Sequence, residues 1–201
     1  MKNIIILIVF LLFTTLSVKA NVIGISTHPM SERKHAVNTE FSSYMNNGEG
    51  LGLNARYNYK ASKVLSYDAG IGVSEGERAN RLFAGTDYML FEDYASQPRV
   101  SIKSFIETAD EFEERHYRLG VAPTLSKGFS FWGKEGFPFV ALPVSLDLND
   151  DNDTYETTSA LAMGITSFYE TKSTLMMNVE ANIGLSNSYT SIVAGITLLI
   201  E

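Results

Sequence analysis

The residues of this chain that could carry out chemistry gather in two polar stretches. In the first, "DLNDDNDTYE", acidic and amide residues alternate from Asp147 to Asp153 in the manner of a calcium-binding loop. The EF-hand loop requires Gly at its sixth position and Glu at its twelfth, where this chain has Asn152 and Thr158. The spacing therefore favours a polar surface hairpin loop, with weak divalent-ion binding as the alternative.

The second stretch contains a histidine beside acidic residues. The chain has three histidines, His28, His35 and His116, and His116 lies two residues after the acid-rich segment 110–114. An acid–His pair there could transfer protons, but a catalytic site also needs a nucleophile and a positioned substrate, which the pattern does not supply. We therefore expect a solvated acidic loop with a histidine at a strand start, no cofactor and no enzymatic activity.

The elements that would position these residues are β-strands. From Leu175 to Leu185 every second residue is apolar, and the residues between them are mostly polar or small. A period of two is typical of a strand with one apolar and one polar face. The same alternation occurs in the segments 35–45, 50–60, 64–74, 81–90, 99–108, 116–126, 137–148, 158–169, 175–185 and 190–200. The sequence predicts an all-β chain of about ten strands, with eight as the alternative count.

The N-terminus has the pattern of an export signal. Lys2 precedes an apolar run from Ile4 to Phe13, and small residues follow up to Ala20. This run is shorter than the roughly 20 residues that span a bilayer. We expect a cleaved signal peptide at 1–20, a periplasmic lead-in at 21–33 and a barrel domain at 34–201.

Composition excludes several classes of protein. There is no Cys, so disulfides, thiolate metal sites and a lipoprotein anchor are excluded. The formal net charge is -7, and removal of 1–20 would take away Lys2 and Lys19 and make it more negative. An acidic exported chain is a poor partner for nucleic acid.

The connectors between the predicted strands alternate between two kinds. The segments 46–49, 75–80, 109–114 and 149–156 are polar and acidic, whereas 57–63, 90–98, 129–137 and 167–173 contain or adjoin aromatic residues. Alternate connectors of an up-and-down meander lie at the same end, so one end is expected to be acidic and the other aromatic. The predicted aromatic girdle consists of Tyr57, Tyr59, Phe91, Tyr94, Phe129, Phe131, Trp132, Phe168 and Tyr169. A girdle of this kind is typical of a barrel at a lipid–water interface.

Strand length favours the same interpretation. Strands of about ten residues fit a tilted membrane strand, whereas globular strands average about 5–6 residues. In a membrane barrel the polar face lines the lumen. The predicted lumenal charge network is Glu40, Arg56, Asp68, Arg81, Asp87, Lys103, Glu107, Arg118 and Glu180. With a three-residue loop at 61–63, Arg56 would face Asp68 directly and form an ion pair with it.

With its signal peptide, meander, girdle and lack of Cys, the chain resembles the small outer-membrane β-barrel proteins of Gram-negative bacteria, the porin-like and adhesion-type barrels. The resemblance covers the mature region from 34 to 201. It departs at the C-terminus, where such barrels usually end in an aromatic residue and this chain ends in Ile200 and Glu201. The resemblance implies contact with outer-membrane lipid, and assembly by periplasmic chaperones and the barrel-assembly machinery.

These features predict a closed, antiparallel, up-and-down transmembrane β-barrel in the outer membrane. We expect a structural, adhesive or narrow-pore role, with an external loop partner that the sequence does not identify. Two alternatives remain open at this stage. One is a barrel-embedded enzyme that is lipid A deacylase-like or omptin-like, and the other is a soluble periplasmic β-barrel carrier.

Overall fold

The computed structural model of the chain describes residues 34–45, 50–75, 78–111, 113–170 and 174–200. The predicted signal peptide and periplasmic lead-in lie outside these ranges. Within them, no helix is long and apolar enough to cross a membrane. The regular structure is β1 His35–Tyr44, β2 Gly50–Lys60, β3 Leu65–Ser74, β4 Arg78–Phe91, β5 Arg99–Glu111, β6 Glu114–Ser126, β7 Phe129–Phe131, β8 Lys134–Ala141, β9 Val144–Asn149, β10 Thr154–Phe168, β11 Leu175–Ser186 and β12 Ser191–Ile200.

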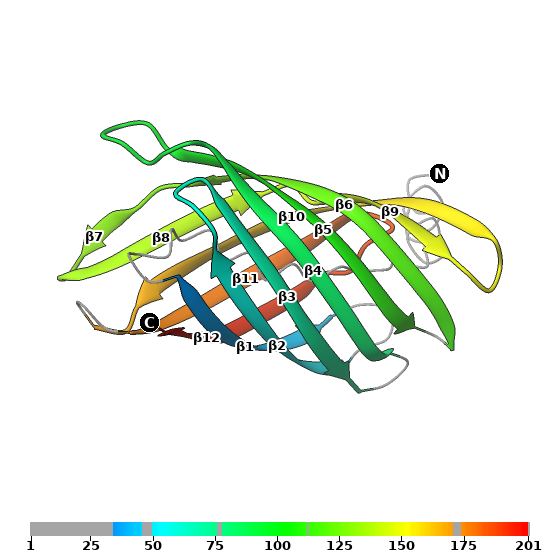
Figure 1. Ribbon diagram of the computed structural model, residues 1–201. Helices are drawn as coiled ribbons and strands as arrows, with labels where there is room; N and C mark the ends of the chain where they lie inside the picture. Colours follow the sequence, from blue (N-terminus) through cyan, green and yellow to red (C-terminus); the bar gives the residue numbers. More distant parts are fainter. Residues whose placement is uncertain (1–33, 46–49, 76–77, 112, 171–173, 201) are drawn as a thin grey trace, which may run out of the picture.

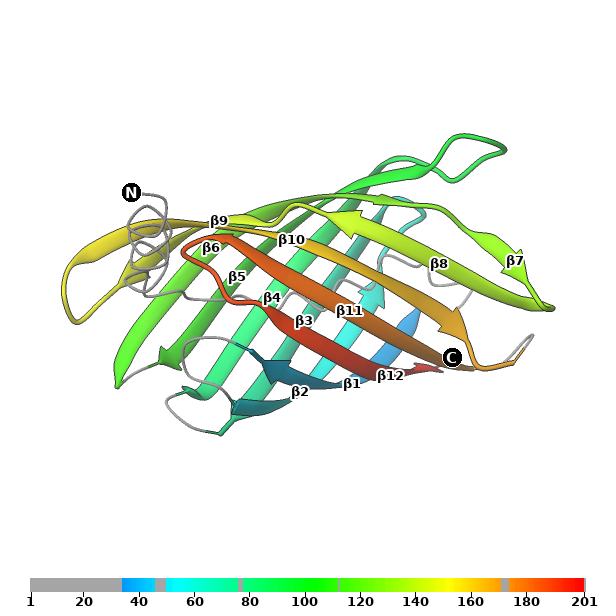
Figure 2. The ribbon, with the colours of Figure 1, turned by 180° about the vertical axis from the view of Figure 1, so that it is seen from behind.

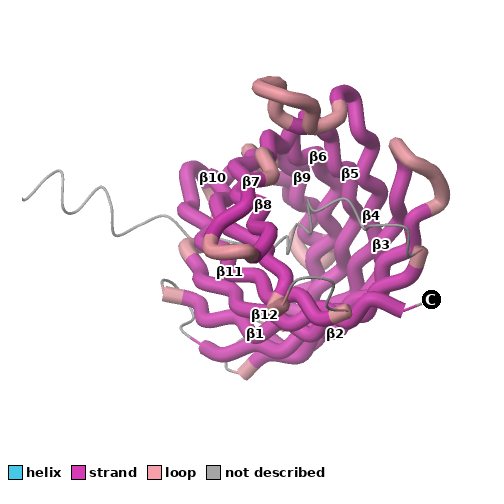
Figure 3. The backbone as a smooth tube through the Cα atoms, turned by 90° about the vertical axis from the view of Figure 1, so that its left-hand side faces the viewer, coloured by secondary structure: helices cyan, strands magenta, loops and turns pink. Residues whose placement is uncertain are grey.

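The strands form one closed antiparallel sheet. From β1 to β6 each strand pairs with the next, and the series returns through β10 and β11 to β12. β12 then pairs with β1 along the whole length of both strands, from His35 opposite Ile200 to Tyr44 opposite Ser191. Figure 1 shows the tilted strands of one side and Figure 2 those of the other. Seen from the end in Figure 3, the strands follow one another around a ring. Within the described residues, the strands of the ring therefore pair with a neighbour on each side, as closure requires.

Strands β8 and β9 are two parts of a single barrel strand. Both pair with β6 on one side and with β10 on the other, and the register is the same before and after the break. The break falls at Leu142 and Pro143, because proline has no N–H to donate to the ladder. The strand expected at 137–148 is therefore interrupted. Counted this way the barrel has ten strands, which confirms the predicted closed up-and-down fold and its preferred strand count.

The short strand β7 extends the sheet beyond the ring. It pairs with the start of β8 through a two-residue turn, Trp132-Gly133, in which both residues have positive φ (47° and 74°). That backbone suits a tight hairpin, and glycine adopts it without strain at the second position. The β7–β8 hairpin projects at the same end as the C-terminal end of β12, the left-hand end of Figure 1.

The strands are longer at the acidic end than the sequence indicates. β4 begins at Arg78, β5 continues to Glu111 and β10 begins at Thr154, all within segments expected to be connectors. Apart from the broken strand, the barrel strands have 10 to 15 residues. Charged residues at this end therefore occupy fixed inward or outward positions.

Burial is inverted relative to a water-soluble protein. Leu119 and Ile71 are 64% and 58% exposed on the outer surface, whereas the adjacent Arg118 is 1% exposed on the inner one. A soluble barrel or sandwich would bury its apolar faces against each other. Here the apolar faces point out from a single sheet that encloses charged and amide side chains.

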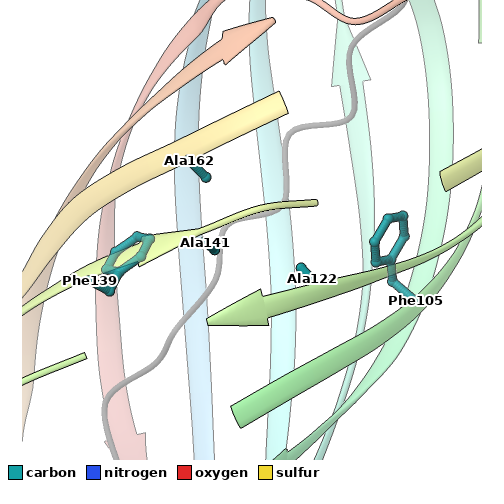
Figure 4. Close-up of a cluster of buried hydrophobic side chains, with 5 residues drawn as sticks. All are labelled: Phe105, Ala122, Phe139, Ala141 and Ala162. Carbon is teal, nitrogen blue, oxygen red and sulfur yellow. The ribbon is translucent and has the colours of Figure 1, made fainter. Parts of the chain in front are cut away.

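Three inward phenylalanines fill part of the lumen. Phe83, Phe105 and Phe139 each lie directly opposite a glycine of a neighbouring strand and cover it. Figure 4 shows the rings of Phe105 and Phe139 in one buried cluster with Ala122, Ala141 and Ala162 of β6, β8 and β10. The lumenal glycines at these places accommodate aromatic rings.

Candidate functional site in the barrel lumen

The nine residues of the predicted charge network all lie in the barrel interior. Each is at most 8% exposed. The structure adds four buried ionisable residues that the sequence reasoning assigned elsewhere or passed over: Arg99, Glu111, His116 and Asp147. Glu111 lies past the predicted end of its strand, whereas Arg99, His116 and Asp147 lie within the predicted segments, and all four have the inward parity of their strands.

One group of charges lies near the middle of the barrel and is called here the central cluster: Glu40, Arg56, Asp68 and Lys103. Arg56 Nε is 3.2 Å from Glu40 Oε1, and its Nη1 donates to Asp68 Oδ2 at 2.9 Å. The Lys103 ammonium lies 2.8 Å from the other oxygen of Asp68. Side chains from β1, β2, β3 and β5 are therefore joined across the lumen by charge-assisted hydrogen bonds.

The pairing of Arg56 with Asp68 is diagonal. Arg56 lies opposite Gly70, and Asp68 lies opposite Asn58, so the predicted direct opposition is wrong by two residues. The connection is longer than expected because the turn closes at Leu65, whose carbonyl accepts from the Ala61 amide at 3.0 Å. A shift of two residues preserves the face of each side chain, and the two groups still meet inside the barrel.

A second group, the Arg118 cluster, lies toward the acidic end. The Arg118 guanidinium contacts three carboxylates: Glu107 at 3.2 Å, Glu111 at 2.6 Å and Asp147 at 3.0 Å. Arg81 lies 3.7 Å from Glu107 on the far side. One arginine thus joins β5, β6 and β9, and the removal of its charge would take a shared cation away from three buried carboxylates.

His116 lies near the start of β6, as expected, but its side chain belongs to this buried group. It is 1% exposed, and its Nδ1 lies 3.0 Å from Asp147 Oδ1. The inward position follows from the alternation on β6, which places His116 on the same face as Arg118. The His–Asp contact is enclosed by the barrel. His35, by contrast, lies at the start of β1 with Nδ1 2.5 Å from the hydroxyl of Tyr57.

The residues that resembled a calcium loop do not converge. Asp147 points into the lumen toward Arg118, Asp151 accepts a hydrogen bond from the Arg115 amide at 2.8 Å, and Asn149 donates to Glu114. No group of three or more His, Asp or Glu side chains in the described ranges is arranged to hold a metal ion. The surface-hairpin interpretation fits the segment from Asp150 to Asp153, which is exposed.

Near the aromatic end, Arg99 on β5 donates to Asp87 on β4 and to Ser101 Oγ at 3.1 Å. The lumen therefore carries ion pairs along its length. Among the described residues, the buried basic side chains are Arg56, Arg81, Arg99, Lys103 and Arg118, and the buried acidic ones are Glu40, Asp68, Asp87, Glu107, Glu111, Asp147 and Glu180. Acidic groups are in excess.

The connection between β4 and β5 is fixed to the base of the β7–β8 hairpin. The Lys127 ammonium contacts Asp93 and donates to the carbonyls of Ala95 at 2.6 Å and Gln97 at 3.2 Å. Burial raises the pKa of Asp93, but hydrogen bonds from Lys127 and the Gly128 amide outweigh it, and the pKa is lowered overall. This contact is therefore formed at neutral pH and weakens only as the pH falls through the depressed pKa of Asp93.

Eight of the nine predicted girdle residues are exposed at the aromatic end. Trp132 is 88% exposed, and its ring stacks on Phe131 with centroids 4.1 Å apart. Phe168 was assigned wrongly. It is half-buried and packs against the inward Ala36, Met176 and Leu199, because its position on β10 has inward parity.

Comparisons with known proteins give a limited result. No protein-family model and no curated protein matches the chain. Among solved structures, one from work described as de novo design of transmembrane β-barrels has a TM-score of 0.42 and 16% identity, covering 86% of this chain and all of the other. LpxR from Salmonella typhimurium has a TM-score of 0.46 and 11% identity, covering 86% of each chain. At this identity and overlap, neither similarity assigns an activity to the chain.

Proposed function

We propose that this protein is an integral outer-membrane β-barrel with a structural, adhesive or narrow-pore role, and that it is not an enzyme. The inverted burial carries the proposal. A belt of exposed Leu, Ile, Val and Phe side chains encircles a barrel whose interior is charged. In water that surface would be an aggregation hazard, whereas in a bilayer it is the surface that lipid tails require.

Two further observations support a defined orientation. The aromatic residues gather at the end where β1 begins and β12 ends, and the acidic connectors lie at the opposite end. Aromatic rings suit the headgroup level of a membrane interface. We therefore assign the aromatic end to the periplasmic side, with the predicted lead-in, and the acidic end to the outside.

The ion pairs of the lumen support low permeability. Arg56 and Arg118 each join carboxylates of different strands across the interior, and the inward phenylalanines occupy further space. The enclosed position of His116 also argues against catalysis on an external substrate, because it is 1% exposed.

Conductance measurements in planar bilayers test this role. The wild-type barrel is expected to pass little current, and Arg56→Ala to raise the conductance several-fold, because the variant removes the side chain that bridges Glu40 and Asp68. Arg115→Ala, at an exposed pair with Asp110, is the control and should match the wild type. A large wild-type conductance would contradict a lumen closed by ion pairs.

Fractionation tests the location. The protein should be found with the outer membrane, require detergent for extraction and migrate differently on gels before and after heating. Recovery as a dissolved protein without detergent would favour the periplasmic carrier.

An activity assay tests the absence of catalysis. The wild type and His116→Ala are both expected to leave lipid A and test peptides uncleaved. Cleavage by the wild type that is lost in His116→Ala would favour the barrel-embedded enzyme.

A further inference from the structure

The connection between β11 and β12 folds into the barrel at the acidic end. β11 leaves β12 after Asn182 and continues beside β10 as far as Ser186. The chain returns to β12 through residues 187–190, which are called here the inner loop, and Figure 2 shows this connection at the end of the barrel opposite the C-terminus. Connecting loops usually run over the surface, but Ser188 and Tyr189 are 4% and 0% exposed.

A glycine makes room for the inner loop. Gly184 has the inward parity of β11, between the outward Ile183 and Leu185. A Cβ atom on Gly184 would lie 2.2 Å from the carbonyl oxygen of Ser188, which is far inside van der Waals contact. Because a Cβ at this position would point into the lumen, the backbone of Ser188 lies on the inner face of the sheet. The inner loop therefore covers part of the lumen from within.

Hydrogen bonds hold the inner loop against the strands on both sides. Asn187 donates from Nδ2 to the Thr157 carbonyl of β10 at 3.2 Å, and the Ser188 hydroxyl donates to the Ser159 carbonyl at 2.5 Å. On the other side, the amide that follows β1 donates to the Thr190 carbonyl at 3.0 Å. The inner loop thus reaches from β10 to the end of β1.

Tyr189 joins the inner loop to side chains of the barrel wall. Its ring meets the ring of Tyr44 of β1 edge to face, with centroids 6.3 Å apart, and both belong to one buried cluster with Val193 of β12. The Tyr44 hydroxyl accepts a hydrogen bond from Arg81 of β4 at 3.4 Å. Arg81 in turn lies 3.7 Å from a carboxylate of the Arg118 cluster. These contacts form a continuous layer of side chains across the acidic end of the lumen.

The cavity beside this layer is small. It is bordered by Tyr44, Arg81 and Glu111 and has a volume of about 10 Å³, roughly the space that one water molecule needs. The ion pairs of the Arg118 cluster lie on β5, β6 and β9, whereas the inner loop contacts β10, β11 and the end of β1. The two therefore obstruct different parts of the lumen at the same end.

We propose that the inner loop is the barrier to polar solutes at the acidic mouth of the lumen, with Tyr189 as the residue that closes it. A buried aromatic ring packed on Tyr44 and Val193 excludes water, and its removal would open a path along β12. This inference rests on the proposed narrow-pore role and deepens it, because the inner loop then decides which solutes enter the lumen from the outside.

Cysteine labelling tests the barrier, since the chain has no Cys of its own. Val193→Cys places a thiol on the lumenal face of β12, in contact with Tyr189. In the detergent-solubilised barrel, a charged methanethiosulfonate reagent should modify this thiol about ten-fold faster when Tyr189→Ala is added, because thiol reactivity follows access. Tyr155→Ala, at a tyrosine that is 74% exposed near the same end, is the control and should leave the rate unchanged. Ser186→Cys, exposed at the end of β11, should be labelled rapidly in every background.

Gly184→Ala is a second way to displace the inner loop, because the added Cβ would collide with the backbone of Ser188 while Tyr189 is retained. It should also accelerate labelling of Val193→Cys, and it keeps the test available if Tyr189→Ala does not fold. Labelling rates that stay the same in both variants would overturn the proposal, and so would rapid labelling of Val193→Cys with the wild-type loop. Labelling in detergent does not depend on the membrane assignment, so the two can fail separately.

Conductance in planar bilayers tests the role of the barrier in permeation. The central cluster and the inner loop obstruct the lumen one after the other, so their resistances add. The double variant Arg56→Ala, Tyr189→Ala should therefore raise the conductance by more than the sum of the increases in the two single variants. A double variant that conducts no better than Arg56→Ala alone would show that Tyr189 does not limit permeation, which would overturn its assigned role.

Discussion

Replacement of Arg118 by methionine is expected to lower the free energy of unfolding by about 3–5 kcal/mol, the usual cost of removing one partner from a buried ion pair. The variant keeps most of the side-chain volume but leaves Glu107, Glu111 and Asp147 without their shared guanidinium. Urea unfolding of the barrel in lipid vesicles measures the change, with the emission of the single tryptophan, Trp132, as the reporter.

The control for this experiment is Arg115→Met on the same strand. Arg115 forms an ion pair with Asp110 at 2.9 Å, but its side chain is 56% exposed. Pairs in contact with water contribute about 0–1 kcal/mol, so this variant should unfold close to the wild type. If the two variants lost equal stability, the Arg118 cluster would not have the structural role assigned to it. Addition of Glu111→Gln to Arg118→Met should restore part of the loss, because one uncompensated charge is then removed.

The second large effect is expected one residue further along β6. Leu119 points outward from the middle of the strand and is the most exposed of the outward leucines. Leu119→Arg should lower the free energy of unfolding in vesicles by about 2–4 kcal/mol, because an arginine on the lipid face near the midplane is poorly solvated. The same urea titration measures it.

Tyr155→Arg provides the position control for Leu119→Arg. Tyr155 also lies outward, but close to the acidic end at the start of β10. The cost of arginine falls to about 0–1 kcal/mol near an interface, so this variant should change little. In a water-soluble barrel both substitutions would be surface changes within about 0.5 kcal/mol of the wild type. A neutral Leu119→Arg would therefore contradict contact between this surface and lipid.

Much of the fold follows from the period-two pattern. The alternation located all ten barrel strands, because a strand between lipid and a polar lumen must alternate at nearly every position. It did not locate the interruption in the seventh barrel strand. Pro143 interrupts the backbone hydrogen bonds of this strand, but it does not change the alternation of inward and outward side chains. Ser145 and Asp147 therefore point inward after it.

The site was less accessible from sequence than the fold. Which charged side chains point inward follows from the alternation along each strand alone. Which of them pair depends on the register between neighbouring strands. The register between β2 and β3 is set by a turn whose length the sequence leaves open. His116 lies near a strand start, as its position in the sequence indicates, but its acidic neighbours suggested solvent, whereas β6 begins at Glu114 and its alternation places the histidine inward. The aromatic type of Phe168 predicts the girdle, but its parity on β10 turns the side chain inward.

The contact between the outward apolar face and lipid is tested most directly by moving the single tryptophan. In the double variant Trp132→Phe, Leu119→Trp, the new indole lies on the outer face midway along β6. In vesicles, lipids brominated deep in their acyl chains should quench its emission strongly, and aqueous iodide should quench it weakly. Strong quenching by iodide with no effect of brominated lipid would show that this face meets water, and the membrane assignment would be wrong.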